Sequence, residues 1–217
     1  MSRRALILLC AACAAGLLGA CRSGPPAPDW QLAAKDSLDR ALQAYLVGRT
    51  KVEAAEFARA RGELQRTGRP DLVARAELMR CAARTASLVL EPCAGFEALR
   101  ADAAPPERAY ADYLAGRLSP PDAALLPPQH RAVASGGSSL PDGAEPLARL
   151  VAAAVLLQAG RASPTVVAQA VETASAQGWR RPLLAWLGVQ ARLAEQGGDA
   201  DAAARIRRRI DLVPPAP

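Results

Sequence analysis

Few residues of this 217-residue chain could carry out acid–base chemistry. His130 is the only histidine, and it follows Pro127-Pro128, a pair that predicts a loop. A histidine works as a general base when it accepts a proton from an oriented nucleophile. Ser135, Ser138 and Ser139 are near His130 only in sequence. We therefore interpret His130 as a surface or structural residue, and the alternative is a hydrolase that uses His130.

Other patterns that could bind a cofactor or a nucleic acid are incomplete. Gly136-Gly137 lacks the Gly-Lys-Ser/Thr ending of a phosphate-binding loop. The basic run Arg205–Arg209 is interrupted by Ile206, which shares an apolar helix face with Ile210, so a solvated helix face is favoured over a nucleic-acid patch. No histidine or second cysteine pair lies near Cys81 and Cys93. The sequence thus predicts no enzyme, no cofactor, no metal site and no nucleic-acid partner.

The N-terminal segment has the order of a secretory signal peptide. Arg3 and Arg4 precede an apolar run from Ala5 to Leu18, and two small residues then precede Cys21. The apolar run is shorter than the roughly 20 residues that a bilayer core requires. Leu18-Gly19-Ala20-Cys21 resembles the lipobox of bacterial lipoproteins. The alternatives are ordinary secretion and a short membrane anchor.

The lipobox resemblance implies cleavage before Cys21, acylation of its sulfur, and attachment to the membrane through this lipid. In such lipoproteins an aspartate after the cysteine is associated with inner-membrane retention, and this chain has Arg22 there. The resemblance therefore implies the outer membrane, with the protein on the periplasmic face. Loss of Arg3 and Arg4 lowers the net charge from +6 to +4, a mild bias that predicts a solvated surface.

Two cysteines remain once Cys10 and Cys13 leave with the signal peptide and Cys21 is acylated. In an oxidising compartment Cys81 and Cys93 are expected to form a disulfide. Twelve residues of straight helix would span about 18 Å, and a disulfide tolerates roughly 6 Å between Cα atoms. The chain must therefore turn back before Pro92. Two buried free thiols are the alternative.

The composition predicts helices that pack closely over small side chains, because the apolar content comes mainly from Ala, Leu and Val. The predicted organisation, in residue numbers, is a signal peptide (1–20), a Pro-rich linker (21–29), an N-terminal helical lobe (30–134), a Gly/Ser/Pro linker (135–145), a C-terminal helical lobe (146–213) and a tail (214–217).

Capping signals predict where the helices begin. Asp29 is expected to cap a helix that starts at Trp30, Thr50 and Glu53 to form a capping box, and Ser163 to cap a helix opened by Pro164. Pro70 opens a third helix with Met79 on its apolar face. Prolines limit the segments 96–101, 107–115 and 122–126 to short helices, and four longer ones are predicted at 146–158, 164–176, 182–195 and 200–212. The apolar stretch 147–157 predicts a central helix.

Three segments look alike, and each ends in Gly-Arg: 44–49, 112–117 and 156–161. Gly48 and Gly116 are 68 residues apart, twice the roughly 34-residue period of tetratricopeptide repeats. Counted from Gly48, Phe57 and Ala60 match that family's positions, but Glu53 stands where a small residue belongs. The chain thus resembles that family and predicts an all-α fold of antiparallel hairpins, either a TPR-like α-solenoid or an Ala-rich helical bundle.

The function these expectations favour is a non-catalytic protein-interaction or assembly module of the bacterial envelope. Its partner would be another envelope protein bound in a groove. The aromatic residues that could anchor that partner are Trp30, Tyr45, Trp179 and Trp186. Core packing is the alternative role for each of these residues. The alternative function is a periplasmic envelope hydrolase that uses His130, and a purely structural tether is a third possibility.

Overall fold

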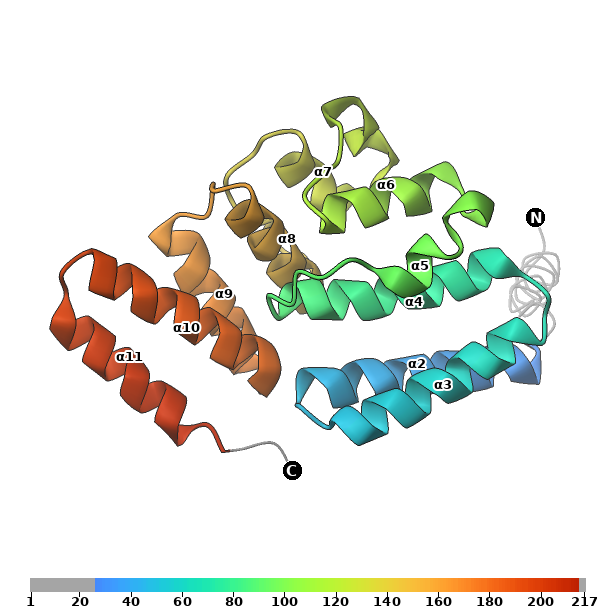
Figure 1. The fold of residues 1–217 in the computed structure, drawn as a ribbon, viewed down its shortest axis with the longest axis horizontal. Helices are drawn as coiled ribbons and strands as arrows, with labels where there is room; N and C mark the ends of the chain where they lie inside the picture. The colour runs from blue at the N-terminus through green and yellow to red at the C-terminus, as the bar shows by residue number, and fades with distance from the viewer. Residues whose placement is uncertain (1–25, 215–217) are drawn as a thin grey trace, which may run out of the picture.

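The computed structural model describes residues 26–214, which form helices joined by short turns (Figure 1). Within this range there is no strand, and the prediction of an all-α fold is confirmed. No helix in the same range is long and apolar enough to cross a bilayer. The signal segment and Cys21, on which the lipobox prediction falls, lie outside the described residues.

The elements, in chain order, are α2 (Asp29–Leu46), α3 (Thr50–Gln65), α4 (Pro70–Ala86), α5 (Ala94–Glu97), the 3₁₀ helix η2 (Arg100–Asp102), α6 (Pro105–Leu114), the 3₁₀ helix η3 (Pro120–Leu125), α7 (Pro128–Ala134), α8 (Pro146–Gln158), α9 (Pro164–Ala176), α10 (Arg180–Gln196) and α11 (Ala200–Leu212). The last four confirm the predicted helices, except that α10 begins at Arg180, two residues before the predicted Pro182.

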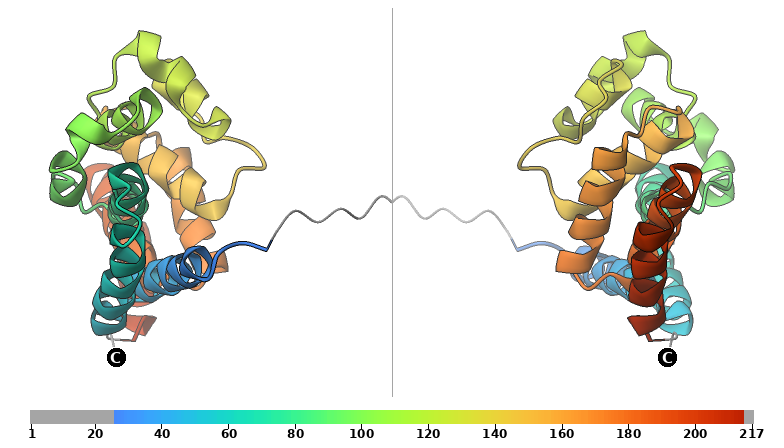
Figure 2. Two further views of the ribbon diagram at one scale, coloured as in Figure 1. Left: turned by 90° about the vertical axis from the view of Figure 1, so that its right-hand side faces the viewer. Right: turned by 90° about the vertical axis from the view of Figure 1, so that its left-hand side faces the viewer.

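Helix α4 lies at the centre of the arrangement. The α2–α3 hairpin packs on one side of it, α6 and α8 pack on others, and α9, α10 and α11 follow α8 as successive antiparallel neighbours (Figure 1). Helix α10 also reaches back to α2. Figure 2 shows η3 and α7 at the end of the molecule opposite the C-terminal end of α11.

One hydrophobic cluster runs through most of the protein, and α8 is its centre. Residues 150–154 of α8 are completely buried, as the apolar stretch predicts. Three of these five residues are alanines, so neighbouring helices can approach closely. The cluster includes Ala74 of α4 and Ile206 of α11. The helices before and after the irregular segment 135–145 therefore share one core.

The helix starts show which capping predictions hold. Ser163 caps α9 and accepts a hydrogen bond from the Val166 amide at 3.2 Å, as predicted. The Asp29 cap is wrong, because α2 begins at Asp29 itself and has no side-chain cap. The capping box is also wrong, because α3 begins at Thr50 with no side-chain cap and Glu53 instead bonds Arg80 of α4.

The Gly-Arg segments that suggested a repeat share a helix-ending backbone motif. Gly48 and Gly116 have positive φ angles of 92° and 67°, and the amide of the arginine after each donates to the carbonyl five residues earlier. This is the Schellman pattern, which satisfies carbonyls at a helix end. The third segment, at Gly160, has the same bonds. Local capping therefore explains why the three segments look alike.

The predicted Cys81–Cys93 disulfide is confirmed. Helix α4 ends at Ala86, and the chain turns back so that the two Cα atoms are 5.9 Å apart. Replacing both cysteines by alanine is expected to lower the free energy of unfolding by about 2 to 3 kcal/mol, because the bridge removes loop-closure entropy from the unfolded chain. Urea titration of the double variant against the oxidised protein measures this difference. Equal midpoints with equal slopes would contradict the expectation.

Candidate functional site

A groove of about 450 Å³ opens between α4, α6 and the η3–α7 segment. We call it the α4–α6–α7 groove. Met79 and Leu125 are 39% and 40% exposed, and both line this groove. Its complete lining is Arg75, Leu78, Met79, Pro106, Glu107, Tyr110, Leu125, Leu126, Pro127 and Arg131. The groove thus offers a mainly apolar surface that contains three charged residues.

Charged residues of the groove hold its walls in place. Arg75 Nε donates to Glu107 Oε1 at 2.7 Å and links α4 to α6. Arg131 Nε donates to the Leu126 carbonyl at 2.7 Å and holds α7 against the end of η3. The second Glu107 oxygen is buried and has no hydrogen-bond partner among residues 26–214. The walls are therefore fixed by polar contacts, and the apolar side chains remain accessible.

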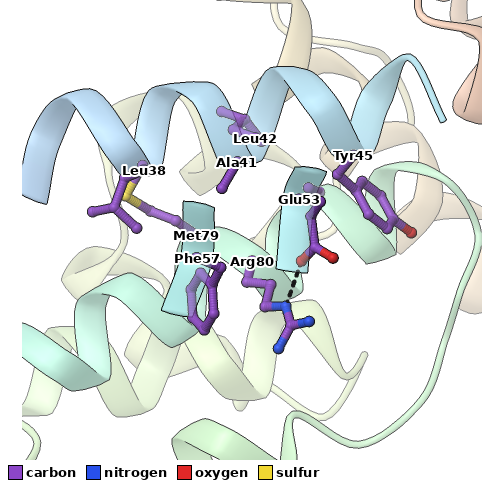
Figure 3. Close-up of a pocket in the computed structure, with 9 residues that line it drawn as sticks. Leu38, Ala41, Leu42, Tyr45, Glu53, Phe57, Met79 and Arg80 are labelled. Atoms are coloured by element: carbon purple, nitrogen blue, oxygen red, sulfur yellow. Dashed lines mark hydrogen bonds and ion pairs between the residues drawn. The ribbon is translucent and has the colours of Figure 1, made fainter. Parts of the chain in front are cut away.

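A smaller pocket lies on the other side of Met79, between α2, α3 and α4 (Figure 3). Its volume of about 20 Å³ is room for one or two water-sized groups. Figure 3 shows Met79 and Phe57 in its wall, with Glu53 and Arg80 joined beside them. Met79 lines both this pocket and the α4–α6–α7 groove. The small pocket therefore adjoins the groove through Met79.

His130 lies behind this groove and not in a loop as predicted. It belongs to α7, which starts with Pro128 at its first position, and its ring is buried against Tyr113 and Tyr110, with ring centroids 5.0 and 5.4 Å away. Burial lowers the His130 pKa to about 4, and burial raises the pKa of both tyrosines. Its Nδ1 has no partner in the described part of the chain. His130 is therefore neutral at pH 7.

Stability is expected to depend on pH through His130. Its pKa is about 4 when folded and roughly 6.5 when unfolded, so the unfolded chain binds the proton more tightly. The stabilising effect of the neutral ring is complete above pH 6.5 and declines as the pH falls to 4, by at most about 3 kcal/mol. Urea midpoints of wild type and His130→Phe measured from pH 7 to 4 test this. A slope that persists unchanged in His130→Phe would contradict it.

The four aromatic residues predicted as partner anchors do not line the groove. Trp186 is completely buried in α10, and its indole N–H donates to the Ala86 carbonyl at 3.0 Å. Tyr45 is buried in α2 beneath the Arg181 guanidinium, 4.2 Å from its ring centroid. Trp30 and Trp179 are partly buried against the hydrophobic clusters. Tyr45 and Trp186 are thus both buried, and Tyr45 also lines the smaller pocket.

The groove residues that sequence reasoning missed are Leu125 and Tyr110, while Met79 was placed on an apolar helix face without a functional role. The available signal was the series of proline pairs, which keeps η3 and α7 short. The short η3 and α7 line the groove together with α4 and α6, where Met79 is partly exposed.

Comparisons with protein-family models, with curated proteins and with solved structures find no match to this chain.

Proposed function

We propose that this chain is a non-catalytic binding module whose α4–α6–α7 groove takes an apolar segment of a partner protein. The observation that supports this most is the exposure of Met79 and Leu125 across a groove with fixed walls. Flexible methionine side chains are common at surfaces that bind apolar helices. The groove volume of about 450 Å³ falls in the range of ligand-binding pockets.

The setting we propose is the periplasmic face of a bacterial outer membrane, with the chain anchored by acyl groups at Cys21. The lipobox resemblance supports this anchor, and the Cys81–Cys93 disulfide is consistent with an oxidising compartment. The antiparallel hairpins α2–α3, α8–α9 and α10–α11 support a distant likeness to tetratricopeptide proteins. The partner is accordingly an envelope protein.

The absence of catalysis is part of the proposal. His130 packs against two neutral tyrosines, and its Nδ1 has no hydrogen-bond partner among residues 26–214. A general base requires an oriented nucleophile. We expect His130→Phe, which keeps an aromatic ring at this position without titrating, to leave the cellular phenotype of the protein unchanged.

Met79→Asp and Leu125→Asp are expected to abolish partner binding, because each places a charge in the apolar groove that an apolar segment would have to desolvate. The loss of stability should be smaller than for a fully buried residue, since both side chains are already partly in water. Val52→Asp is the matched control, because Val52 is 46% exposed on α3 and lies outside the groove. Affinity purification from detergent-solubilised envelopes measures partner recovery. Recovery that is equal in all three variants would contradict the proposal.

A further inference from the structure

A second pocket lies where the C-terminal end of α2, the start of α10 and the end of α11 meet. Its volume is about 580 Å³. Leu212 is 81% exposed beside it, the most exposed of the large apolar side chains in residues 26–214. Its lining consists of Gln43, Val47, Arg49, Gly178, Arg180, Leu183, Leu212, Val213 and Pro214. We call it the α2–α10 pocket.

The charges of this pocket are both positive. Arg49 and Arg180 are the only charged residues in its lining, and neither forms an ion pair with a carboxylate of the described residues. This differs from the α4–α6–α7 groove, where Arg75 is neutralised by Glu107. The α2–α10 pocket therefore combines apolar walls with two cations that lack a protein counter-ion within residues 26–214.

Backbone contacts fix the position of the Arg180 guanidinium. Its Nη1 donates to the Pro214 carbonyl at 2.8 Å, and its Nη2 lies so close to Gly48 that a Cβ there would be 2.8 Å away. Its Nε is buried without a hydrogen-bond partner in the described range. Gly48 has a φ of 92°, which favours glycine, and the lack of a side chain also leaves room for the Arg180 guanidinium. The guanidinium is thus held in place at the pocket without being neutralised.

We propose that the α2–α10 pocket binds a single-chain amphiphile with a carboxylate head, a role that goes beyond the binding of a protein partner. The carboxylate pairs with Arg49 and Arg180, since guanidinium groups bind carboxylates through charge-assisted hydrogen bonds. The alkyl chain covers Leu183, Leu212 and Val213. A small inorganic anion would leave these apolar walls in water, and a neutral alkyl chain would leave both cations without a counter-ion.

The test is calorimetric titration of the full chain with octanoate below its critical micelle concentration, with 1-octanol and acetate as matched ligands. Saturable binding of octanoate at one site is expected, with 1-octanol and acetate at least tenfold weaker. Arg180→Gln and Arg49→Gln should each weaken octanoate binding at least tenfold, and Arg205→Gln on α11 should leave it unchanged. Arg49 is exposed, so its variant folds even where Arg180→Gln does not.

Equal binding of octanoate and 1-octanol would overturn the proposal, because the cations would then have no role. Octanoate binding that is unchanged in Arg49→Gln, or reduced equally in Arg205→Gln, would also overturn it. The Met79→Asp variant separates this site from the groove, since it should lose the protein partner and keep octanoate binding.

Discussion

Trp186→Ala is expected to lower the free energy of unfolding by about 4 kcal/mol, the cost of removing a completely buried aromatic ring from a packed core. The expected loss in Tm is about 10 °C for a chain of this size. The indole N–H donates to Ala86 at the end of α4, 100 residues earlier in the chain, so the variant also leaves a carbonyl without its partner. Urea denaturation followed by circular dichroism measures the loss.

Trp186→Phe is the control for the hydrogen bond, because it keeps most of the apolar volume and removes the donor. A loss of about 1 to 2 kcal/mol is expected for it. If Trp186→Ala cost less than 1 kcal/mol, the core shared by α4, α8 and α10 would not hold the helices of 30–134 and 146–213 together.

Arg80→Met is expected to lower the free energy of unfolding by about 3 to 4 kcal/mol, because it leaves the Glu53 carboxylate buried without its cation. Glu53 is 4% exposed on α3, and Arg80 Nε on α4 donates to it at 2.7 Å (Figure 3). The Arg80 guanidinium also lies 4.5 Å from the ring centroid of Phe57, so cation–π attraction is lost as well. Chemical denaturation of the variant at pH 7 gives the value.

The double variant Glu53→Met/Arg80→Met isolates the cause. It replaces the ion pair by apolar side chains of similar length, and we expect it to recover most of the stability that Arg80→Met loses. Arg59→Met is a second control: Arg59 is exposed on α3 and pairs with Glu56, which also pairs with Arg40, so the variant should cost less than 1 kcal/mol. A double variant that is no more stable than Arg80→Met would show that packing, and not the unpaired carboxylate, explains the loss.

Local signals in the sequence predicted much of the fold. Pro70, Pro164 and Ser163 begin helices because their preferences act within one turn. The Cys81–Cys93 bridge was predicted because these two cysteines remain in an oxidising compartment, and the distance along a straight helix then required the turn before Pro92.

Tertiary contacts explain where the sequence predictions failed. Thr50 and Glu53 have the spacing of a capping box, but Arg80 lies 27 residues later and binds Glu53 in the interior. The same contact explains why a carboxylate occupies the position where a tetratricopeptide repeat has a small residue. His130 was predicted in a loop because two prolines precede it, yet Pro128 at the first helical position starts α7 and buries the ring.

The α4–α6–α7 groove was beyond sequence reasoning for a similar reason. Periodicity places Met79 on an apolar face of α4, and that pattern alone predicts burial. Its exposure depends on the tertiary packing around α4, where Arg75 bonds Glu107 of α6 and Arg131 of α7 bonds the Leu126 carbonyl. The Arg75–Glu107 contact joins residues that are 32 positions apart in the chain and has no local signature.

Site-specific photo-crosslinking in living cells tests the central claim, that the α4–α6–α7 groove binds a partner protein. A photoreactive amino acid is placed at Leu125, at Val52 on α3, and at Leu125 in a chain that also carries Met79→Asp. The account predicts one discrete protein adduct from Leu125, none from Val52, and loss of the adduct when Met79→Asp is present. An adduct of the same size from Val52, or one from Leu125 that Met79→Asp leaves unchanged, would contradict it.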